Sequence, residues 1–199
     1  MNYDVEMNKI IDNLQGKPTL LLQSCCAPCS TTVIERLINF FDITIIYYNP
    51  NIEPFEEYEK RKKEQIRIIK KYNIKYMDCD YDNELFHEMS VGLEKVPEKG
   101  IRCHKCYRIR LDYTAKKAKK NNFEYFGTTL TVSPYKLTNV INEIGKELEN
   151  IYNIKFLVSD FKKNNGYKRS CEISQALGLY RQDYCGCVFS KNGSENRKR

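Results

Sequence analysis

Short apolar runs alternate with longer amphipathic segments along this chain, and the alternation limits the possible folds more than any other feature. The run Thr19–Gln23 has three leucines at its centre, which is typical of a strand buried on both faces of a parallel sheet. Parallel strands need long crossover connections, so the pattern predicts an α/β fold: a doubly wound parallel sheet with helices on both faces. We expect strands at residues 19–23, 41–48, 75–77, 124–127 and 154–158.

The apolar residues between these runs recur at helical spacing. They predict helices at residues 2–14, 55–72, 83–91, 103–120 and 170–177. Two further helices are expected after Ser30-Thr31, which would cap the first, and after Ser133-Pro134, which would supply the cap and first helical residue of the second. On the 55–72 helix we expect Phe55 to point inward and the residues Lys60, Arg61, Lys62 and Lys63 to form an exposed basic face.

Length and charge limit the function classes. With 199 residues, we expect one domain over residues 1–190, followed by a disordered basic tail at 191–199. The formal net charge of +7 favours an anionic partner such as RNA. The apolar runs are too short for a membrane-spanning helix and the first residues do not form a secretion signal, so we expect a cytoplasmic protein without a membrane partner.

Seven of the nine cysteines fall into three groups: Cys25-Cys26-x-x-Cys29, Cys103-x-x-Cys106 and Cys185-Gly186-Cys187. An odd number of cysteines in a reducing compartment argues against a disulfide framework and favours metal ligation or thiol chemistry. Cys103 and Cys106 share a helix face, whereas Cys185 and Cys187 point the same way from an extended segment. The first group follows a predicted strand, which places a metal site at the carboxyl edge of the sheet. Cys79 and Cys171 stand alone and are expected to be small buried residues.

The number of clustered thiols bears on which metal is bound. Seven do not fill two closed Cys₄ zinc sites, whereas they fit one Cys₄ iron–sulfur cluster with three thiols left for a second metal or for redox work. Two alternatives stay open. One is a non-catalytic zinc protein that binds RNA, and the other is a metal-free dithiol oxidoreductase built on Cys26-Ala27-Pro28-Cys29.

Five ordered segments together carry a family resemblance. They are LLLQSCCAPCS at 20–30, YYNPNIEPFEEYEKRKKE at 47–64, RCHKCYRIRL at 102–111, GTTLTVSPYK at 127–136 and GLYRQDYCGCVFS at 178–190. On these segments the chain resembles the cobalamin-independent epoxyqueuosine reductases of the QueH family. The resemblance spans nearly the whole chain.

The resemblance implies an oxidoreductase that reduces epoxyqueuosine to queuosine at the wobble position of tRNAs with a GUN anticodon, the last step of queuosine synthesis. It also implies a Rossmann-like (HUP-like) scaffold that carries a [4Fe–4S] cluster and one additional iron. The reaction needs electrons from outside, so a ferredoxin- or flavodoxin-type donor is implied. The family allows another ligand type, such as Asp, at the position of Cys29.

The matching segments also suggest roles for residues other than cysteine. The candidate proton donors are Tyr107, Tyr135 and Tyr184, with Tyr113 and His104 as further possibilities. The candidate substrate contacts are Arg108, Arg110, Thr128, Thr129, Ser133, Lys136 and Arg181. Basic side chains would hold phosphates and aromatic rings would stack on bases of the anticodon loop.

Overall fold

The computed structural model describes residues 1–191, and its centre is a five-stranded parallel sheet. The strand order is β3-β2-β1-β4-β5, with β1 in the middle, where Leu21 pairs with Thr44 on one side and with Phe126 on the other. The strands are β1 (Thr19–Gln23), β2 (Asp42–Ile46), β3 (Lys75–Met77), β4 (Tyr125–Thr128) and β5 (Lys155–Phe156). The predicted doubly wound parallel sheet is confirmed.

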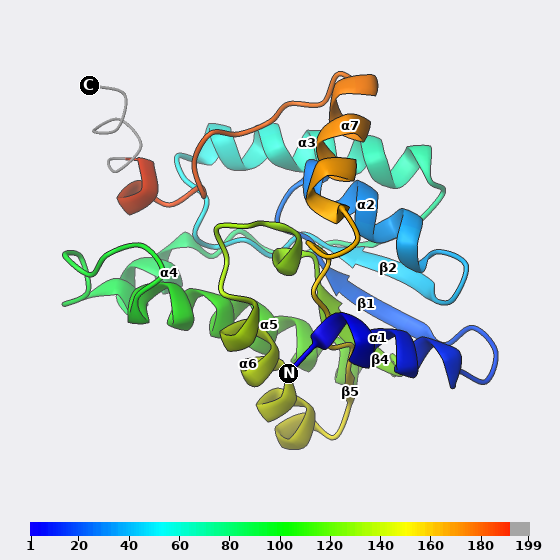
Figure 1. Ribbon diagram of the computed structural model, residues 1–199. Helices are drawn as coiled ribbons and strands as arrows, with labels where there is room; N and C mark the ends of the chain where they lie inside the picture. The colour runs from blue at the N-terminus through cyan, green and yellow to red at the C-terminus, as the bar shows by residue number, and fades with distance from the viewer. Residues whose placement is uncertain (192–199) are drawn as a thin grey trace.

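Helices cover both faces of the sheet (Figure 1). One face carries α2 (Ala27–Leu37), α3 (Phe55–Lys71) and α7 (Gly166–Ala176), and the other carries α5 (Ile101–Lys120) and α6 (Thr138–Tyr152). Successive strand residues point to opposite faces, so Leu20 and Leu22 enter the core beneath α2 and α3 while Leu21 enters the core beneath α5 and α6. The remaining helices are α1 (Tyr3–Asp12), α4 (Asn83–Ser90) and the short 3₁₀ helix η1 (Leu130–Val132).

The strand order places a switch point between β1 and β4. From β1 the chain winds outward to β2 and β3, then returns to the other side of β1 through β4. Ligands of such sheets bind in the crevice that opens beyond the carboxyl ends at this point. Cys25 and Cys26 follow β1 after a single residue, Ser24, and Thr129 directly follows β4.

Three helices begin where the sequence did not indicate. Helix α2 begins at Ala27, so Ser30 and Thr31 are not caps but buried interior residues whose hydroxyls bond to backbone carbonyls of the preceding turn. Pro28 fits the first turn because its missing N–H has no intrahelical partner there. Helix α6 begins at Thr138, so Ser133 ends η1 instead of capping α6. Helix α7 begins at Gly166 rather than near residue 170.

The predicted faces of α3 are wrong at two positions. Phe55 was expected to point inward, but it is 52 % exposed at the first turn. Arg61 was expected on the basic outer face, but only 2 % of it is exposed. Its burial is made possible by a hydrogen-bonded ion pair with Glu57 one turn earlier, where N and O are 2.6 Å apart.

Among residues 1–191, no helix is both long enough and apolar enough to cross a membrane. The predicted disordered tail falls almost entirely on residues 192–199, which lie outside the described part of the chain. A single domain over residues 1–190 stays a prediction.

Candidate metal centre

The first thiol group lies at the start of α2, directly beyond the carboxyl end of β1. Cys26 is the N-cap of this helix, and Cys29 lies in its first turn. The sulfurs of Cys25, Cys26 and Cys29 all lie within 4.8 Å of one another. They come together because the chain turns sharply from strand to helix, which brings residues 25 and 26 back over the first helical turn. Three thiols this close can ligate one metal ion.

The three thiols differ in protonation. The pKa of Cys25 is well below its usual value, because the thiols of Cys26 and Cys29 donate hydrogen bonds to its sulfur. The positive charge of Arg110 and, more weakly, a hydrogen bond from the Thr129 hydroxyl lower this pKa further. The Thr129 Oγ1 atom lies 3.4 Å from this sulfur and also accepts a bond from the Cys25 backbone N–H. The bond to Cys25 raises the pKa of Cys26 to about 12, with burial adding to the effect. One thiolate therefore forms readily in the metal-free group, and the other two thiols keep their protons.

The second thiol group joins α5 to the segment that follows α7. Cys103 and Cys106 lie in the first two turns of α5, and Cys185 and Cys187 lie near the end of the described chain. Burial raises the pKa of Cys106 to about 12, and the neighbouring Cys185 and Cys187 also raise it. Burial likewise raises the pKa of Cys103, with Cys185 again acting in the same direction. The four thiols therefore lie close enough for their charges to influence one another's pKa values. Within residues 1–191, however, only the first group brings three ligand atoms within 4.8 Å of one another.

Lys136 lies inside the second thiol group. Its Nζ atom is 2.5 Å from the sulfur of Cys185 and 5.8 Å from the centre of the Tyr107 ring. Burial lowers the pKa of Lys136, but Cys185 and Tyr107 raise it further, so its net pKa is above the usual value and the side chain stays an ammonium. The predicted substrate contact at Lys136 is thus a cation that faces a thiol.

The two thiol groups line a common cavity of about 220 Å³. Cys26 and Cys29 contribute from the first group and Cys185 from the second. The wall also carries polar and aromatic side chains that the sequence singled out, namely Ser133, Tyr135, Lys136, Arg181 and Tyr184. The structure therefore brings three of the seven predicted cysteines and several predicted substrate contacts to the wall of one cavity at the switch point.

The candidate proton donors occupy different environments. Tyr135 lines the cavity and is 59 % exposed, whereas Tyr107 is only 2 % exposed among the thiols of the second group. Tyr184 also lines the cavity, and its hydroxyl donates to the Glu53 carbonyl 3.0 Å away. Tyr113 stacks on Tyr48, with ring centres 3.7 Å apart. The ring of His104 lies within hydrogen-bond distance of the Lys99 carbonyl, so its contact is with the backbone.

Four of the predicted substrate contacts do not line the cavity. Arg110 is 2 % exposed and donates to the side-chain oxygen of Asn49, 2.6 Å away. Thr128 is buried and donates to the side-chain oxygen of Gln23, and Thr129 contacts Cys25. On the surface, Arg108 forms an ion pair with Glu147. Roles in substrate binding stay predictions for all four.

Two buried polar side chains that the sequence patterns did not single out, Gln65 and Asn49, fix the backbone beside the first thiol group. Gln65 on α3 accepts hydrogen bonds from Ser24 at 2.6 Å and from Ser30 at 2.9 Å. Asn49 donates to the Ser24 carbonyl at 2.8 Å. Both residues are buried; Asn49 lies in the loop between β2 and α3, and Gln65 lies on α3. The sequence offered one indication of their importance. Asn49 lies in the 47–64 segment and Gln65 directly follows it, and this segment matches the family although it has no cysteine.

Comparison with known proteins agrees with this arrangement. The sequence profile of the family described as "Epoxyqueuosine reductase QueH" matches residues 20–193. The chain belongs to the QueH family. It is 43 % identical to the epoxyqueuosine reductase QueH of Staphylococcus epidermidis over 96 % of this chain and 84 % of the relative. It is 35 % identical to the QueH of Thermotoga maritima, over 91 % of this chain and 97 % of the relative. Both relatives are named epoxyqueuosine reductases, and membership of the family makes this chain an oxidoreductase.

Solved structures of similar shape agree on the fold. This chain matches the U34-tRNA thiolase NcsA of Methanococcus maripaludis, a structure with a [4Fe–4S] cluster, with a TM-score of 0.59 and 13 % identity. The match covers 94 % of this chain and 67 % of the thiolase. A predicted tRNA methyltransferase subunit from Methanocaldococcus jannaschii matches with a TM-score of 0.52 and 14 % identity, over 80 % of this chain and 74 % of that one. At these identities the similarity supports a Rossmann-like fold alone.

Proposed function

We propose that this protein reduces epoxyqueuosine to queuosine at the wobble position of tRNAs with a GUN anticodon. One observation carries the proposal: in a chain of the QueH family, thiols from both groups line one cavity at the sheet's switch point. The reaction adds two electrons and two protons to the epoxide, releases its oxygen as water and leaves an alkene. A site for this reaction needs a source of electrons, a group that stabilises the departing oxygen and a source of protons.

We assign the cofactors by the grouping of the thiols. Cys103, Cys106, Cys185 and Cys187 supply four thiolates for a [4Fe–4S] cluster, and Cys25, Cys26 and Cys29 hold one additional iron. The first set fits an iron because its three sulfurs already lie within 4.8 Å of one another, and a three-thiol site leaves a coordination position for the substrate. The second set supplies four free thiols, the number that a [4Fe–4S] cluster needs. When bound, the metals supply one-electron transfer and Lewis acidity toward the epoxide oxygen.

The side chains of the cavity position the substrate and deliver protons. Tyr135 at the exposed end stacks on a base, and Arg181 on the same wall holds a phosphate. The ammonium of Lys136 lies beside Cys185, where it offsets negative charge that gathers on the thiolates. Tyr184 or Tyr107 supplies the protons, since the first lines the cavity and the second lies among the thiols of α5.

The chemistry also defines the partners and the compartment. The tRNA is recognised at its single-stranded anticodon loop, where the modified base is accessible without opening a duplex. The electrons come one at a time from a ferredoxin- or flavodoxin-type protein. All nine cysteines are free thiols in the structure, in keeping with a protein that works in the reducing cytoplasm.

The decisive experiment combines metal analysis with nucleoside mass spectrometry. The protein is purified and reconstituted without oxygen, then incubated with epoxyqueuosine-containing tRNA, a strong reductant and no cobalamin. We expect iron–sulfur absorption that bleaches on reduction and conversion of the tRNA nucleoside to queuosine. Stoichiometric zinc without colour would support the RNA-binding alternative, and a redox couple without metal would support the dithiol alternative. Persistence of the epoxide beside a fully reduced cluster would contradict the reductase proposal.

A further inference from the structure

The segment from Asn49 to Glu64 contributes no thiol to the metal centre, yet two of its side chains contact the chain around Cys185 and Cys187. These side chains are Glu53, in the loop before α3, and Arg61, in the middle of that helix. Arg61 belongs to a row of four basic residues, but it differs from Lys60 and Lys63 because it is buried. A buried guanidinium needs partners for its charge and for its N–H groups.

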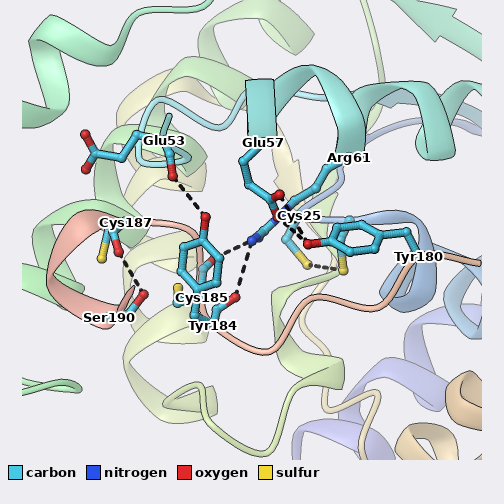
Figure 2. Close-up of polar contacts among 10 residues, drawn as sticks. Cys25, Glu53, Glu57, Arg61, Tyr180, Tyr184, Cys185, Cys187 and Ser190 are labelled. Atoms are coloured by element: carbon cyan, nitrogen blue, oxygen red, sulfur yellow. Dashed lines mark hydrogen bonds and ion pairs between the residues drawn. The ribbon is translucent and has the colours of Figure 1, made fainter. Parts of the chain in front are cut away.

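The three guanidinium nitrogens of Arg61 each have a partner (Figure 2). The Nε atom donates to Glu57 at 2.6 Å, and the two terminal nitrogens donate to the carbonyls of Cys185 at 3.1 Å and Tyr184 at 3.5 Å. The guanidinium also lies 5.0 Å from the centre of the Tyr184 ring. Arg61 thus binds the backbone of a thiol-bearing residue and of the residue before it.

Glu53 contacts the same segment on the far side of Gly186. Its carboxylate accepts a bond from the Val188 backbone N–H at 2.8 Å, and its backbone N–H donates to the Gly186 carbonyl at 3.0 Å. Its own carbonyl accepts the hydroxyl of Tyr184, a contact drawn in Figure 2. Together, Glu53 and Arg61 bond to the backbone on both sides of Gly186.

Gly186 shows how tightly the segment is held. Its φ of +127° is in the region that favours glycine. A Cβ atom there would come within 2.8 Å of an Ile52 methylene carbon and 3.1 Å of an Arg61 nitrogen. A side chain at this position would therefore push the segment away from α3 and its preceding loop.

We infer that Arg61 and Glu53 are positioning residues that hold Cys185 and Cys187 in the metal centre by fixing the backbone of the Cys185-Gly186-Cys187 segment. The inference rests on the proposed function, because the segment serves as half of a metal site. These two cysteines lie between α7 and the end of the described chain, outside any strand that a sheet ladder could fix. Side chains that orient metal ligands in this way are worth about 10–100-fold in metal affinity or activity.

The test uses Arg61→Met and Gly186→Ala, with Lys63→Met as the control that removes a positive charge from the exposed side of the same helix. In the metal-free protein, each thiol is alkylated with iodoacetamide under reducing conditions and its rate is mapped by mass spectrometry, with Cys171 on α7 as internal reference. We expect Cys185 and Cys187 to react several-fold faster in Arg61→Met and in Gly186→Ala, and at the wild-type rate in Lys63→Met. Arg61→Lys should restore part of the protection, since one ammonium cannot reach all three acceptors.

A second measurement separates positioning from RNA binding. In titrations with ferrous iron and sulfide, we expect Arg61→Met to bind iron about 10–100-fold more weakly than Lys63→Met. Equal thiol reactivity in wild type, Arg61→Met and Gly186→Ala would overturn the inference, as would weaker tRNA binding by Arg61→Met with unchanged iron affinity. If Arg61→Met does not fold, Arg61→Lys decides: thiols as slow to react as in the wild type would overturn the inference, because one ammonium cannot replace all three guanidinium contacts. Thiol reactivity is measured without metal or tRNA, so a wild-type enzyme that loads iron but leaves the epoxide intact would count against the proposed function alone.

Discussion

The ammonium of Lys136 lies 2.5 Å from the sulfur of Cys185, although 49 positions separate the two residues in the sequence. Lys136 precedes α6 at the end of the GTTLTVSPYK segment, and Cys185 belongs to the segment after α7. The contact joins two of the segments that carry the family resemblance. It also places a positive charge next to a thiol that we assign to the cluster.

We predict that Lys136→Met lowers iron binding as well as turnover. The substitution removes the cation that faces Cys185, so thiolates of the second group are less stabilised in a buried site. Lys136→Arg should retain most of the iron because it keeps the charge. The measurement is iron per chain at limiting ferrous iron, beside tRNA affinity of the metal-free protein. Normal iron content with weakened tRNA binding would instead make Lys136 a phosphate contact, as the sequence alone suggested.

The cysteines should separate into two classes when each is changed to Ala or Ser. Loss of a thiol from either group opens a ligand set whose members act as a unit, so nearly all turnover should be lost. This class contains Cys25, Cys26, Cys103, Cys106, Cys185 and Cys187. Cys79 and Cys171 lie outside both groups, and each is partly buried rather than fully buried as the sequence suggested. Their variants should keep turnover, at a cost of about 1 kcal/mol in unfolding free energy. Iron content, absorption spectrum and turnover are compared for every variant.

The variants of Cys29 test whether this thiol belongs to the additional iron or to the cluster. Because it lies with Cys25 and Cys26 rather than with the four thiols of the second group, Cys29→Ala should keep the cluster's colour and lose turnover. Cys29→Asp supplies an anionic oxygen ligand and should retain part of the activity. A colourless Cys29→Ala protein would place this thiol in the cluster set, and full activity of Cys103→Ala or Cys185→Ala would refute the two-group assignment.

The sequence predicted the sheet and the grouping of Cys25, Cys26 and Cys29 better than it predicted the surroundings of the thiols. Strand–helix alternation and the run Thr19–Gln23 were sufficient for the parallel sheet, because such patterns depend on local burial. Arg61 was assigned to the surface because it lies in a run of four basic residues, which is typical of an exposed helix face. The pattern did not show that Glu57, one turn earlier, neutralises its charge in the interior. The contact between Lys136 and Cys185 was not predictable, since it depends on how two loops meet above the sheet.

The metal-free protein should lose stability as the pH rises above about 8.5, the ordinary pKa of a thiol. The hydrogen bond to Cys25 raises the pKa of Cys26 to about 12, and burial raises that of Cys106 to about 12. At intermediate pH the unfolded chain has released these protons while the folded chain keeps them. The unfolded state then binds fewer protons, so the free energy of unfolding falls with increasing pH.

Thermal denaturation under reducing conditions, from about pH 8 to about pH 10, measures this effect below the usual pKa of tyrosine. Cys106→Ser removes one of the two thiols and should make the fall in melting temperature shallower. A melting temperature that does not change over this interval would mean that these thiols ionise equally in the folded and unfolded chains.

Tyr135 distinguishes stacking from proton transfer. The ring lines the cavity and is 59 % exposed, so it is accessible to a base of the anticodon loop. Stacking requires the ring and not the hydroxyl, so Tyr135→Phe should bind and turn over tRNA like the wild type. Tyr135→Ala should weaken tRNA binding by about 1–3 kcal/mol, the usual contribution of one stacked base.

The matched control is Phe40→Ala, which removes an exposed ring between α2 and β2. This ring lies near the amino ends of the strands, whereas the cavity lies beyond their carboxyl ends. Binding of tRNA is measured at several salt concentrations, because phosphate contacts weaken with salt whereas stacking changes little. Tyr135→Ala should shift the affinity at every salt concentration by a similar factor and leave the iron content unchanged. If Tyr135→Phe binds tRNA normally but loses turnover, the hydroxyl is a proton donor, and the stacking assignment then fails to explain the role of this residue.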